Sequence, residues 1–476
     1  METLDNVNWL EEVRARQDEL LEDLFRILKI ESVRDDAAAT VDAPVGPGPK
    51  AAMEEFLKMA DEDGFVTQQF GPWVGRIDIG EGDETFGILG HVDVVPPGNG
   101  WDSDPFEPRL EEGRVIARGA LDDKGPMVAA YMALKILRDK GVTFNKRIQL
   151  LIGTDEESGW SCMKNYLLNE PAPDFGFSPD SRFPIVNGEK GNVSVRIKNK
   201  SGASKKGQAH LVKFKAGLRK NMVPEVAEAT IQSPEAVELV ATIEQSLGEQ
   251  SAIPSYEVTV EGDVIDVRVE GEGAHGSTPE KGLNAGTHLA YALRDISMDD
   301  EAAQDFIKIL ANELHLNHDG AKLEVDMHHE VMGHLSMNVG IIHFKEADGG
   351  EIDCNFRYPT GSSGQEIANQ MKVFLKKAGY NLFVEMQPDR APHFVPSDDP
   401  IVTTLLDVYE RQTGQKGYEK TIGGGTYAQL MPRGVAYGVL FPDSVDMMHK
   451  ANEYIELDDL LLATSIFTEA IYRLSR

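Results

Sequence analysis

Acidic and imidazole side chains recur at the ends of segments that have the pattern of β-strands. His91 and Asp93 stand two residues apart in GHVDVVP, so their side chains share one face of an extended chain. A single residue of this kind is most often a helix cap or a solvated loop residue. The same residue types recur in four further motifs: RGALDDKG with Asp122 and Asp123, GTDEESGW with Asp155, Glu156 and Glu157, SPDSRFP with Asp180, and MMHKANE with His449.

The gathering of these groups, more than any one of them, indicates a metal. Several carboxylates in one crevice repel one another unless a cation neutralises them. Mixed imidazole and carboxylate ligands suit zinc or manganese better than calcium or magnesium. We therefore expect a metal site if the fold brings these motifs together.

The segments that carry the motifs alternate between strand and helix patterns. Residues 85–95 and 146–158 have the pattern of buried strands, and residues 124–141 between them form an amphipathic helix pattern. Such alternation predicts an α/β fold with a mostly parallel sheet flanked by helices. In such sheets the sites lie beyond the carboxyl ends of the strands, where these motifs stand.

The periodicity of the hydrophobic residues changes in the middle of the chain. Residues 192–202, 209–217 and 256–271 alternate with the period of half-buried antiparallel strands, and helical patterns follow at 284–296 and 302–314. We interpret residues 187–391 as an inserted α+β lid domain. Residues 1–186 and 392–476 would then be the two parts of a catalytic domain. Within it we expect one helix over 8–29, a strand at 434–441 and a final helix at 458–474.

The composition narrows the functional class. The chain has 476 residues, 41% of them hydrophobic, and a formal net charge of −32. A surface of that charge repels phosphate backbones and anionic lipid, which argues against nucleic-acid and membrane partners. Only two cysteines occur, Cys162 and Cys354, so no disulfide framework is expected. No signal peptide or membrane span is visible, and we predict a cytoplasmic protein.

Five of the motifs, GHVDVVP, GALDDKG, TDEESGW, SPD and HKANE, occur in an order and spacing that resembles the co-catalytic di-zinc exopeptidase and deacylase family. That family includes glutamate carboxypeptidase, succinyl-diaminopimelate desuccinylase, aminoacylase and carnosinase. Four more, AHGSTPEKG, GLRKNMVPE, FRYPTG and TIGGGTY, are most similar to its bacterial PepV-type dipeptidase branch. The resemblance covers essentially the whole chain and implies a zinc-exopeptidase-like fold.

The resemblance implies a centre with two metals. Asp122 would bridge them, His91 and Asp180 would complete one site, and Glu157 and His449 would complete the other. We expect two Zn²⁺ per chain, with Mn²⁺ or Co²⁺ as alternatives. Two dications that flank one water molecule make hydroxide available near neutral pH.

The resemblance also implies which residues act beside the metals. Asp93 would hydrogen-bond the ring of His91 and thereby fix its tautomer. Glu156 would be the general base, which takes a proton from water and returns it to the leaving amine. The peptide bond between Asp122 and Asp123 would be cis.

Residues of the inserted block would meet the substrate. The glycine-rich turn around His275 would present its ring to the oxyanion, and Asn221 and Arg357 would hold the carbonyl and the terminal carboxylate. On spacing alone, Arg357 is equally well interpreted as a strand-surface charge. The turn at Gly424 lacks the GK[ST] ending of a phosphate loop, which favours a pocket wall for a small substrate.

The resulting hypothesis is a hydrolase, a di-metal dipeptidase that cleaves short peptides with a free amino terminus, with Xaa-His or β-Ala-Xaa as candidate substrates. The first alternative keeps the site but makes it an N-acyl amino acid or succinyl-diaminopimelate deacylase. The second is a non-enzymatic, metal-stabilised binding protein, against which the spare base Glu156 and His275 argue. The long inserted block favours the dipeptidase branch and a self-sufficient monomer.

Overall fold

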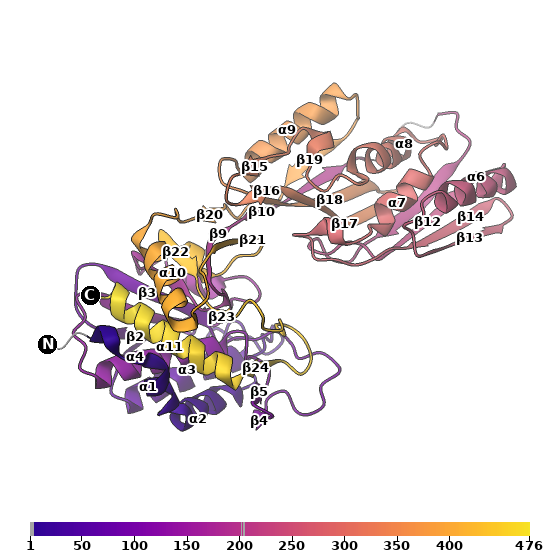
Figure 1. Cartoon of the computed structure of the whole chain (residues 1–476). Helices are drawn as coiled ribbons and strands as arrows, with labels where there is room; N and C mark the ends of the chain where they lie inside the picture. The colour runs from indigo at the N-terminus through magenta and orange to yellow at the C-terminus, as the bar shows by residue number, and fades with distance from the viewer. Residues whose placement is uncertain (1–3, 201, 203–204) are drawn as a thin grey trace. The chain divides into compact units, whose positions relative to one another are not determined.

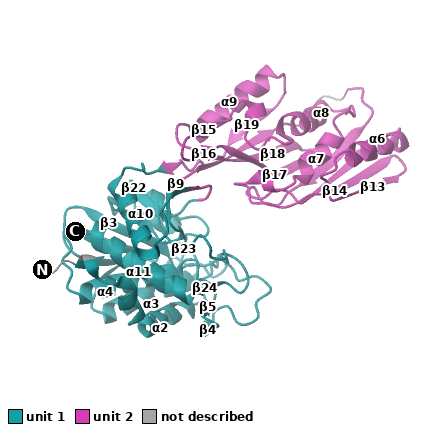
Figure 2. Cartoon of the chain, viewed as in Figure 1, with its two compact units in different colours: residues 1–188, 394–420, 425–476 teal, residues 189–393, 421–424 magenta. Residues whose placement is uncertain are grey.

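A computed structural model describes residues 4–200, 202 and 205–476, which form two compact units (Figures 1 and 2). Unit 1 comprises residues 1–188, 394–420 and 425–476, and unit 2 comprises residues 189–393 and 421–424. The chain therefore leaves unit 1 once for a long excursion and once for four residues. The sequence patterns predict an insertion over 187–391 and do not predict the short second excursion.

Unit 1 is built on a mixed β-sheet. Within the described residues its nine strands lie in the order β1, β2, β6, β3, β7, β22, β9, β20, and β21 also pairs with β9. The central strands β6, β3, β7 and β22 are parallel, and the pairs towards both edges are antiparallel. The parallel arrangement expected from the strand–helix alternation thus occupies the centre of the sheet. The bounds are β1 Val66–Phe70, β2 Val74–Ile79, β3 Thr85–His91, β6 Arg147–Gly153, β7 Phe175–Ser178, β9 Ile185–Glu189 and β22 Arg433–Ala436.

Helices flank this sheet, and α4 is buried along nearly its whole length. It packs against α11, which also contacts α1 and α10 (Figure 1). The single helix expected over 8–29 is two helices, because the chain breaks at Ala15 and Arg16. The bounds are α1 Trp9–Arg14, α2 Gln17–Leu28, α3 Pro47–Glu62, α4 Lys124–Asp139, α5 Ser161–Tyr166, α10 Pro400–Thr413 and α11 Leu457–Leu474. Among the described residues, no helix has the length and apolar character needed to cross a membrane.

The strand expected over 434–441 is interrupted, so this prediction is wrong in part. β22 ends at Ala436, and Val439–Leu440 form a separate strand, β23, which pairs with β8 (Ser181–Arg182). Gly438 between them has a φ of 89°. A Cβ at that position would lie 2.7 Å from the Phe183 ring, so the bend requires glycine.

A small antiparallel sheet joins two distant segments of unit 1. β24 (Tyr454–Glu456) pairs with β5 (Arg114–Ile116), which pairs with β4 (Arg109–Glu111). This pairing brings the residues after β5 beside the residues before β24.

The remaining short elements belong to both units. They are β15 His328–His329, β16 Gly333–His334, β20 His393–Phe394 and β21 Glu419–Ile422, with helical turns at Leu4–Asn6, Pro279–Lys281, Ala321–Leu323 and Tyr427–Leu430.

Unit 2 is an antiparallel sheet with helices. Its eight strands, counted over the described residues, lie in the order β13, β14, β12, β11, β17, β18, β10, β19. Alternate residues such as Val193, Val195 and Ile197 are buried in a core of their own, which is the period-2 pattern expected from the sequence. The bounds are β10 Gly191–Lys198, β11 His210–Ala216, β12 Val226–Gln232, β13 Ser255–Glu261, β14 Val264–Glu270, β17 Ser336–Lys345, β18 Gly349–Tyr358 and β19 Phe383–Met386.

The helices of unit 2 differ most from the sequence predictions. The helix expected over 284–296 is α7, Ala285–Ala292, and the one expected over 302–314 is α8, Glu301–Lys308, followed by a π-helical stretch, Ile309–Leu314. Two helices, α6 (Ala236–Gly248) and α9 (Gly364–Lys377), are not predicted at all. Residue 201, at the end of the strand expected over 192–202, lies outside the described residues.

Candidate metal centre and catalytic site

The central parallel strands of unit 1 present the candidate residues at their carboxyl ends. His91 is the last residue of β3, and Asp180 stands two residues after the end of β7. Glu156 and Glu157 follow β6 by three and four residues. Because β3 lies between β6 and β7 in the sheet, the ends of these strands meet at one edge, as the fold class predicts.

Asp122 lies at the centre of the cluster, just before α4, and its two carboxylate oxygens face different partners. Oδ1 is 3.2 Å from Nε2 of His91, and Oδ2 is 3.0 Å from Nε2 of His449. The His91 Nε2 atom is also 3.6 Å from Oδ2 of Asp180, and the His449 Nε2 atom is 3.2 Å from Oε1 of Glu157. The result is two sets of three ligand atoms that share Asp122, each set within 4.8 Å.

The state of His91 fits a metal ligand. Its Nδ1 atom lies 2.9 Å from the main-chain oxygen of Asp93, to which it donates, and 3.4 Å from the Asp93 carboxylate. Its Nε2 atom is buried, faces Asp122, and has no hydrogen-bond partner among the described residues. Although burial opposes it, the nearby carboxylates of Asp122 and Asp180 raise the pKa of His91 well above its usual value. A dication bound at Nε2 would take the place of the proton that these carboxylates favour, with the tautomer fixed from Nδ1 as in metal-binding histidines.

The charges of the cluster also call for a cation. Burial and the nearby charge of Asp122 raise the pKa of Glu157 to about 7 and that of Asp180 to about 6. Hydrogen bonds to Asp122 and Glu157 raise the pKa of His449 to about 11. Carboxylates this close together share a proton, or pair with a protonated imidazole, unless a dication is bound. The donor set therefore fits two divalent metals with mixed imidazole and carboxylate ligands.

The carboxylate of Asp93 links the strand ends. Its two oxygens accept the backbone N–H groups of Glu156 and Glu157, both at 3.1 Å. Asp93 thus fixes the His91 ring on one side and the Glu156–Glu157 pair on the other. The peptide bond between Asp122 and Asp123 is cis, which confirms the expectation drawn from the resemblance.

Glu156 adjoins the candidate metal ligands without belonging to either set. Burial, together with the charges of Asp180 and Glu157, raises its pKa well above the usual value. Nε1 of Trp160 donates a hydrogen bond to Oε1 of Glu156 at 3.0 Å. Trp160 is not among the site residues predicted from the sequence, although it is the last residue of the TDEESGW motif.

Unit 2 brings its own candidate residues together. The N–H of Gly276 donates to the main-chain oxygen of Asn221 at 2.7 Å, which places the His275 turn against the Asn221 loop. Burial and the charge of Arg357 lower the pKa of His275. Arg357 donates from Nη1 to the main-chain oxygen of Gly423 at 2.8 Å, beside Gly424. These residues, distant in sequence, therefore form a second cluster within unit 2.

Two features of the unit 2 cluster bear on its chemistry. Arg357 is only 6% exposed, and burial together with the charge of Arg390 lowers its pKa to about 10. Its Nε atom is buried with no hydrogen-bond partner among the described residues, so the guanidinium keeps a donor for an anion.

The loop that carries Asn221 is held by a buried asparagine. Nδ2 of Asn338 donates to the carbonyls of Lys220 and Met222, both at 2.9 Å, on either side of Asn221.

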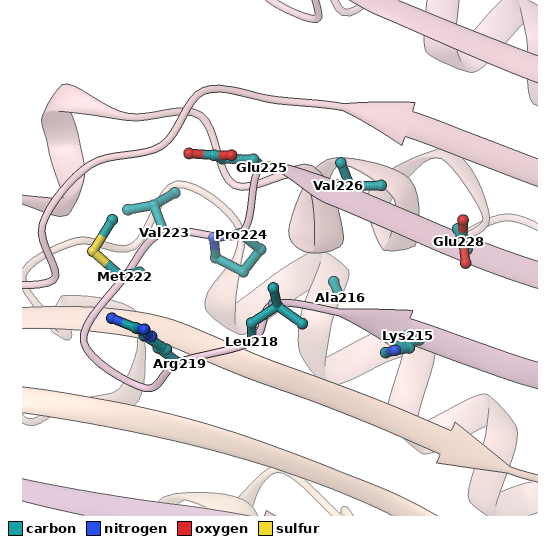
Figure 3. A pocket seen from close by; sticks show the side chains of 11 residues that line it. Lys215, Ala216, Leu218, Arg219, Met222, Val223, Pro224, Glu225, Val226 and Glu228 are labelled. Atoms are coloured by element: carbon teal, nitrogen blue, oxygen red, sulfur yellow. The ribbon is translucent and has the colours of Figure 1, made fainter. Parts of the chain in front are cut away.

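A separate cavity of about 550 Å³ opens in unit 2 between the end of β11 and the start of β12 (Figure 3). Its walls are mostly apolar, with Leu218, Val223 and Pro224 among them, and charged side chains such as Lys215 and Glu228 stand at its margin. None of the described residues that line it belongs to the predicted site.

Comparisons with known proteins identify the family of the chain. The family model "Peptidase family M20/M25/M40" matches residues 87–473. Two bacterial proteins that bear the name "Putative dipeptidase" are similar over nearly their full length. The one from Staphylococcus saprophyticus is 42% identical, covering 98% of this chain and 99% of its own, and YtjP of Bacillus subtilis is 40% identical, covering 99% and 100%.

Solved structures share the fold at low sequence identity. Aminoacylhistidine dipeptidase from Vibrio alginolyticus matches with a TM-score of 0.59 and 16% identity, covering 96% of each chain. The dipeptidase Dug1p from Saccharomyces cerevisiae matches with a TM-score of 0.57 and 14% identity, covering 98% of each. The family model and the relatives confirm the resemblance seen in the motifs: the chain belongs to peptidase family M20/M25/M40.

Proposed function

We propose that this protein is a di-metal dipeptidase. The observation that carries the proposal is the position of Asp122, whose two oxygens face two separate sets of imidazole and carboxylate ligands. A carboxylate shared in this way is what a co-catalytic pair of metals requires. The relatives with 40–42% identity bear dipeptidase names, which supports the substrate class.

The residues of unit 1 would perform the proton transfers of peptide hydrolysis. Two metals held by His91, Asp122, Glu157, Asp180 and His449 would polarise the scissile carbonyl and make hydroxide available near neutral pH. Glu156 accepts the proton of the attacking water and returns it to the leaving amine, a role suited to a carboxyl group of raised pKa. Trp160 orients that carboxylate through its indole N–H.

The residues of unit 2 would recognise the substrate. His275 is proposed to donate to the oxyanion that forms at the scissile carbonyl. Arg357 would pair with the terminal carboxylate, since a planar guanidinium binds a carboxylate through two parallel hydrogen bonds. Asn221 would hold the peptide carbonyl, and the Gly424 turn would form a wall of the pocket. The clustering of these four positions within unit 2 supports the assignment.

The finer parts of the proposal concern metal, substrate and assembly. Zinc is the proposed metal, with Mn²⁺ or Co²⁺ as alternatives, because histidine and carboxylate ligands occur together. Dipeptides of the Xaa-His and β-Ala-Xaa types are the first substrates to test. A monomer is proposed because one chain carries both sets of residues, and a cytoplasmic location is proposed because it is consistent with the bacterial relatives named dipeptidases.

An activity assay tests the proposal directly. Metal-free protein and protein reconstituted with Zn²⁺ would each be given Ala-Ala, β-Ala-His, Ala-Ala-Ala and succinyl-diaminopimelate. We expect hydrolysis of a dipeptide that depends on added metal and is lost in excess chelator. Cleavage of succinyl-diaminopimelate alone would reassign the enzyme as a deacylase. Stoichiometric metal binding with no hydrolysis of any substrate would favour the binding protein.

A further inference from the structure

Glu453 is a fully buried carboxylate that the proposed mechanism does not use. It lies four residues after His449 in the motif HKANE and is 0% exposed. Its Oε2 atom is 2.5 Å from Nη1 of Arg118, which is itself 1% exposed. The pairing of β24 with β5 sets these segments side by side, and the N–H of Ala117 donates to the main-chain oxygen of Glu453 at 3.1 Å.

The same carboxylate binds the backbone that leads to Asp122. Its Oε1 atom accepts the N–H groups of Leu121 at 2.9 Å and of Asp122 at 3.1 Å. Its Oε2 atom accepts the N–H of Gly119 at 3.2 Å. These amides lie in a buried loop just before α4, where each would otherwise need another acceptor. One side chain therefore accepts hydrogen bonds from three backbone N–H groups of the loop that carries the shared candidate ligand.

Arg118 extends the contact to a third segment. Its Nη2 atom lies 3.3 Å from the main-chain oxygen of Pro97, and its guanidinium lies 5.3 Å from the centre of the Trp101 ring. Pro97 and Trp101 belong to the loop that follows His91 and Asp93 along the chain. Three segments that carry candidate site residues thus converge on one buried ion pair.

We propose that Glu453 is a positioning residue of the metal centre, which holds the Asp122 loop and the His449 segment at the separation needed for both to ligate one metal. This inference rests on the proposed di-metal function. The set Asp122, Glu157 and His449 depends on Glu453 for two of its three members. The set His91, Asp122 and Asp180 depends on it for one, because β3 and β7 position the other two.

The asymmetry between the two sets gives a sharp test. Glu453→Gln replaces one acceptor oxygen by an N–H₂ group, which faces either the loop amides or Arg118. Zn²⁺ would be titrated by calorimetry into metal-free protein. We expect two binding steps in the unchanged protein, and in the variant one step weakened by about 10–100-fold with the other changed much less, the range typical of groups that orient metal ligands.

A matched control separates positioning from general stability. Glu469 is also a buried glutamate that pairs with arginines, 2.9 Å from Nη2 of Arg473 and 3.0 Å from Nε of Arg411, but it lies in α11 and contacts no candidate ligand in the described chain. Glu469→Gln should lower the unfolding temperature of the metal-free protein and leave both binding steps in place. The absorption spectrum of the Co²⁺-loaded Glu453 variant should change in its d–d bands, and that of the Glu469 variant should not.

Each outcome bears on one of the two proposals. If the unchanged protein binds no metal, the proposed function fails. If it binds two metals and Glu453→Gln binds both equally well, only the positioning role is overturned. If Glu453→Gln does not fold, Arg118→Lys decides, since it keeps a charge near the carboxylate and loses the planar donor geometry. Weakening of one step then supports the role, and two unchanged steps overturn it.

Discussion

At the scale of single residues, neighbouring side chains of the same type have different partners and are proposed to perform different tasks. Glu156 and Glu157 are consecutive, yet Glu157 lies 3.2 Å from His449 and Glu156 bonds Trp160. A metal ligand must give its lone pairs to the cation, whereas a general base must keep them for a proton. The different partners of the two carboxylates support the proposed division, with Glu157 as a ligand and Glu156 as the base.

Replacement of the base tests that division. Glu156→Gln keeps the size of the side chain and can still contact Trp160, but it removes the basic oxygen. We expect kcat to fall by about 10²–10⁴-fold, the usual contribution of general acid–base catalysis. Metal content, measured by elemental analysis, should stay at the unchanged value. Near-normal turnover would show that another group accepts the proton.

Arg357 provides a second test at this scale. It is buried and keeps a donor atom, so a substrate without a terminal carboxylate leaves its charge unmet. Dipeptides should be preferred over dipeptide amides and tripeptides, and Arg357→Ala should remove about 10–100-fold of that preference in kcat/KM, the value of a hydrogen bond to a charged group. Arg196→Ala, on the neighbouring strand β10 and paired with Asp353, is the control that should leave the preference intact.

At the scale of elements, parallel strands bring the site residues to one edge of the sheet, and side chains then join the strand ends. Asp93, after β3, accepts the N–H groups of Glu156 and Glu157, after β6. The two strands are hydrogen-bonded neighbours throughout their length, and Asp93 carries that link into the loops. A loop held in this way can present two glutamates with fixed directions.

Asp93→Asn should therefore loosen the proposed ligand Glu157 and the proposed base Glu156 together. The asparagine has only one acceptor oxygen for two amides, so one amide N–H would face an N–H₂ group. We expect metal affinity or kcat/KM to fall by about 10–100-fold, with far-ultraviolet circular dichroism unchanged because the strands keep their ladder. A variant with normal metal affinity and normal kcat/KM would show that the strand pairing alone holds the glutamates.

At the scale of the whole molecule, one chain carries the candidate metal ligands in unit 1 and the proposed substrate-binding residues in unit 2. If the proposed function holds, no residue of a second copy is required. Specific activity should therefore stay constant on dilution, with mass measured in parallel by light scattering. Inactive Glu156→Gln and His275→Ala variants should remain inactive when mixed. Recovery of activity in the mixture would show that subunits share residues.

Local sequence patterns predict individual elements unevenly. Buried strands such as β3 and β6 were identifiable because continuous apolar runs end in polar motifs. α9 carries a capping box, Ser363 with Glu366, which is a sequence signal for the start of a helix, although hydrophobic periodicity alone does not predict this helix. The break between β22 and β23 has a local signal in Gly438, whose φ is 89°, but the Phe183 ring that excludes a larger side chain there lies about 250 positions away in sequence.

The sequence by itself determined the types of chemical group, their order along the chain and, through the motifs, the family. It could do so because ligand types and strand ends are local properties. Only the tertiary structure decided that the two oxygens of Asp122 face different histidines, that Asp93 binds two amides from another strand, and that Glu453 binds the loop of Asp122. These are contacts between residues tens to hundreds of positions apart, and their geometry is set by sheet order and by burial, which no single segment encodes.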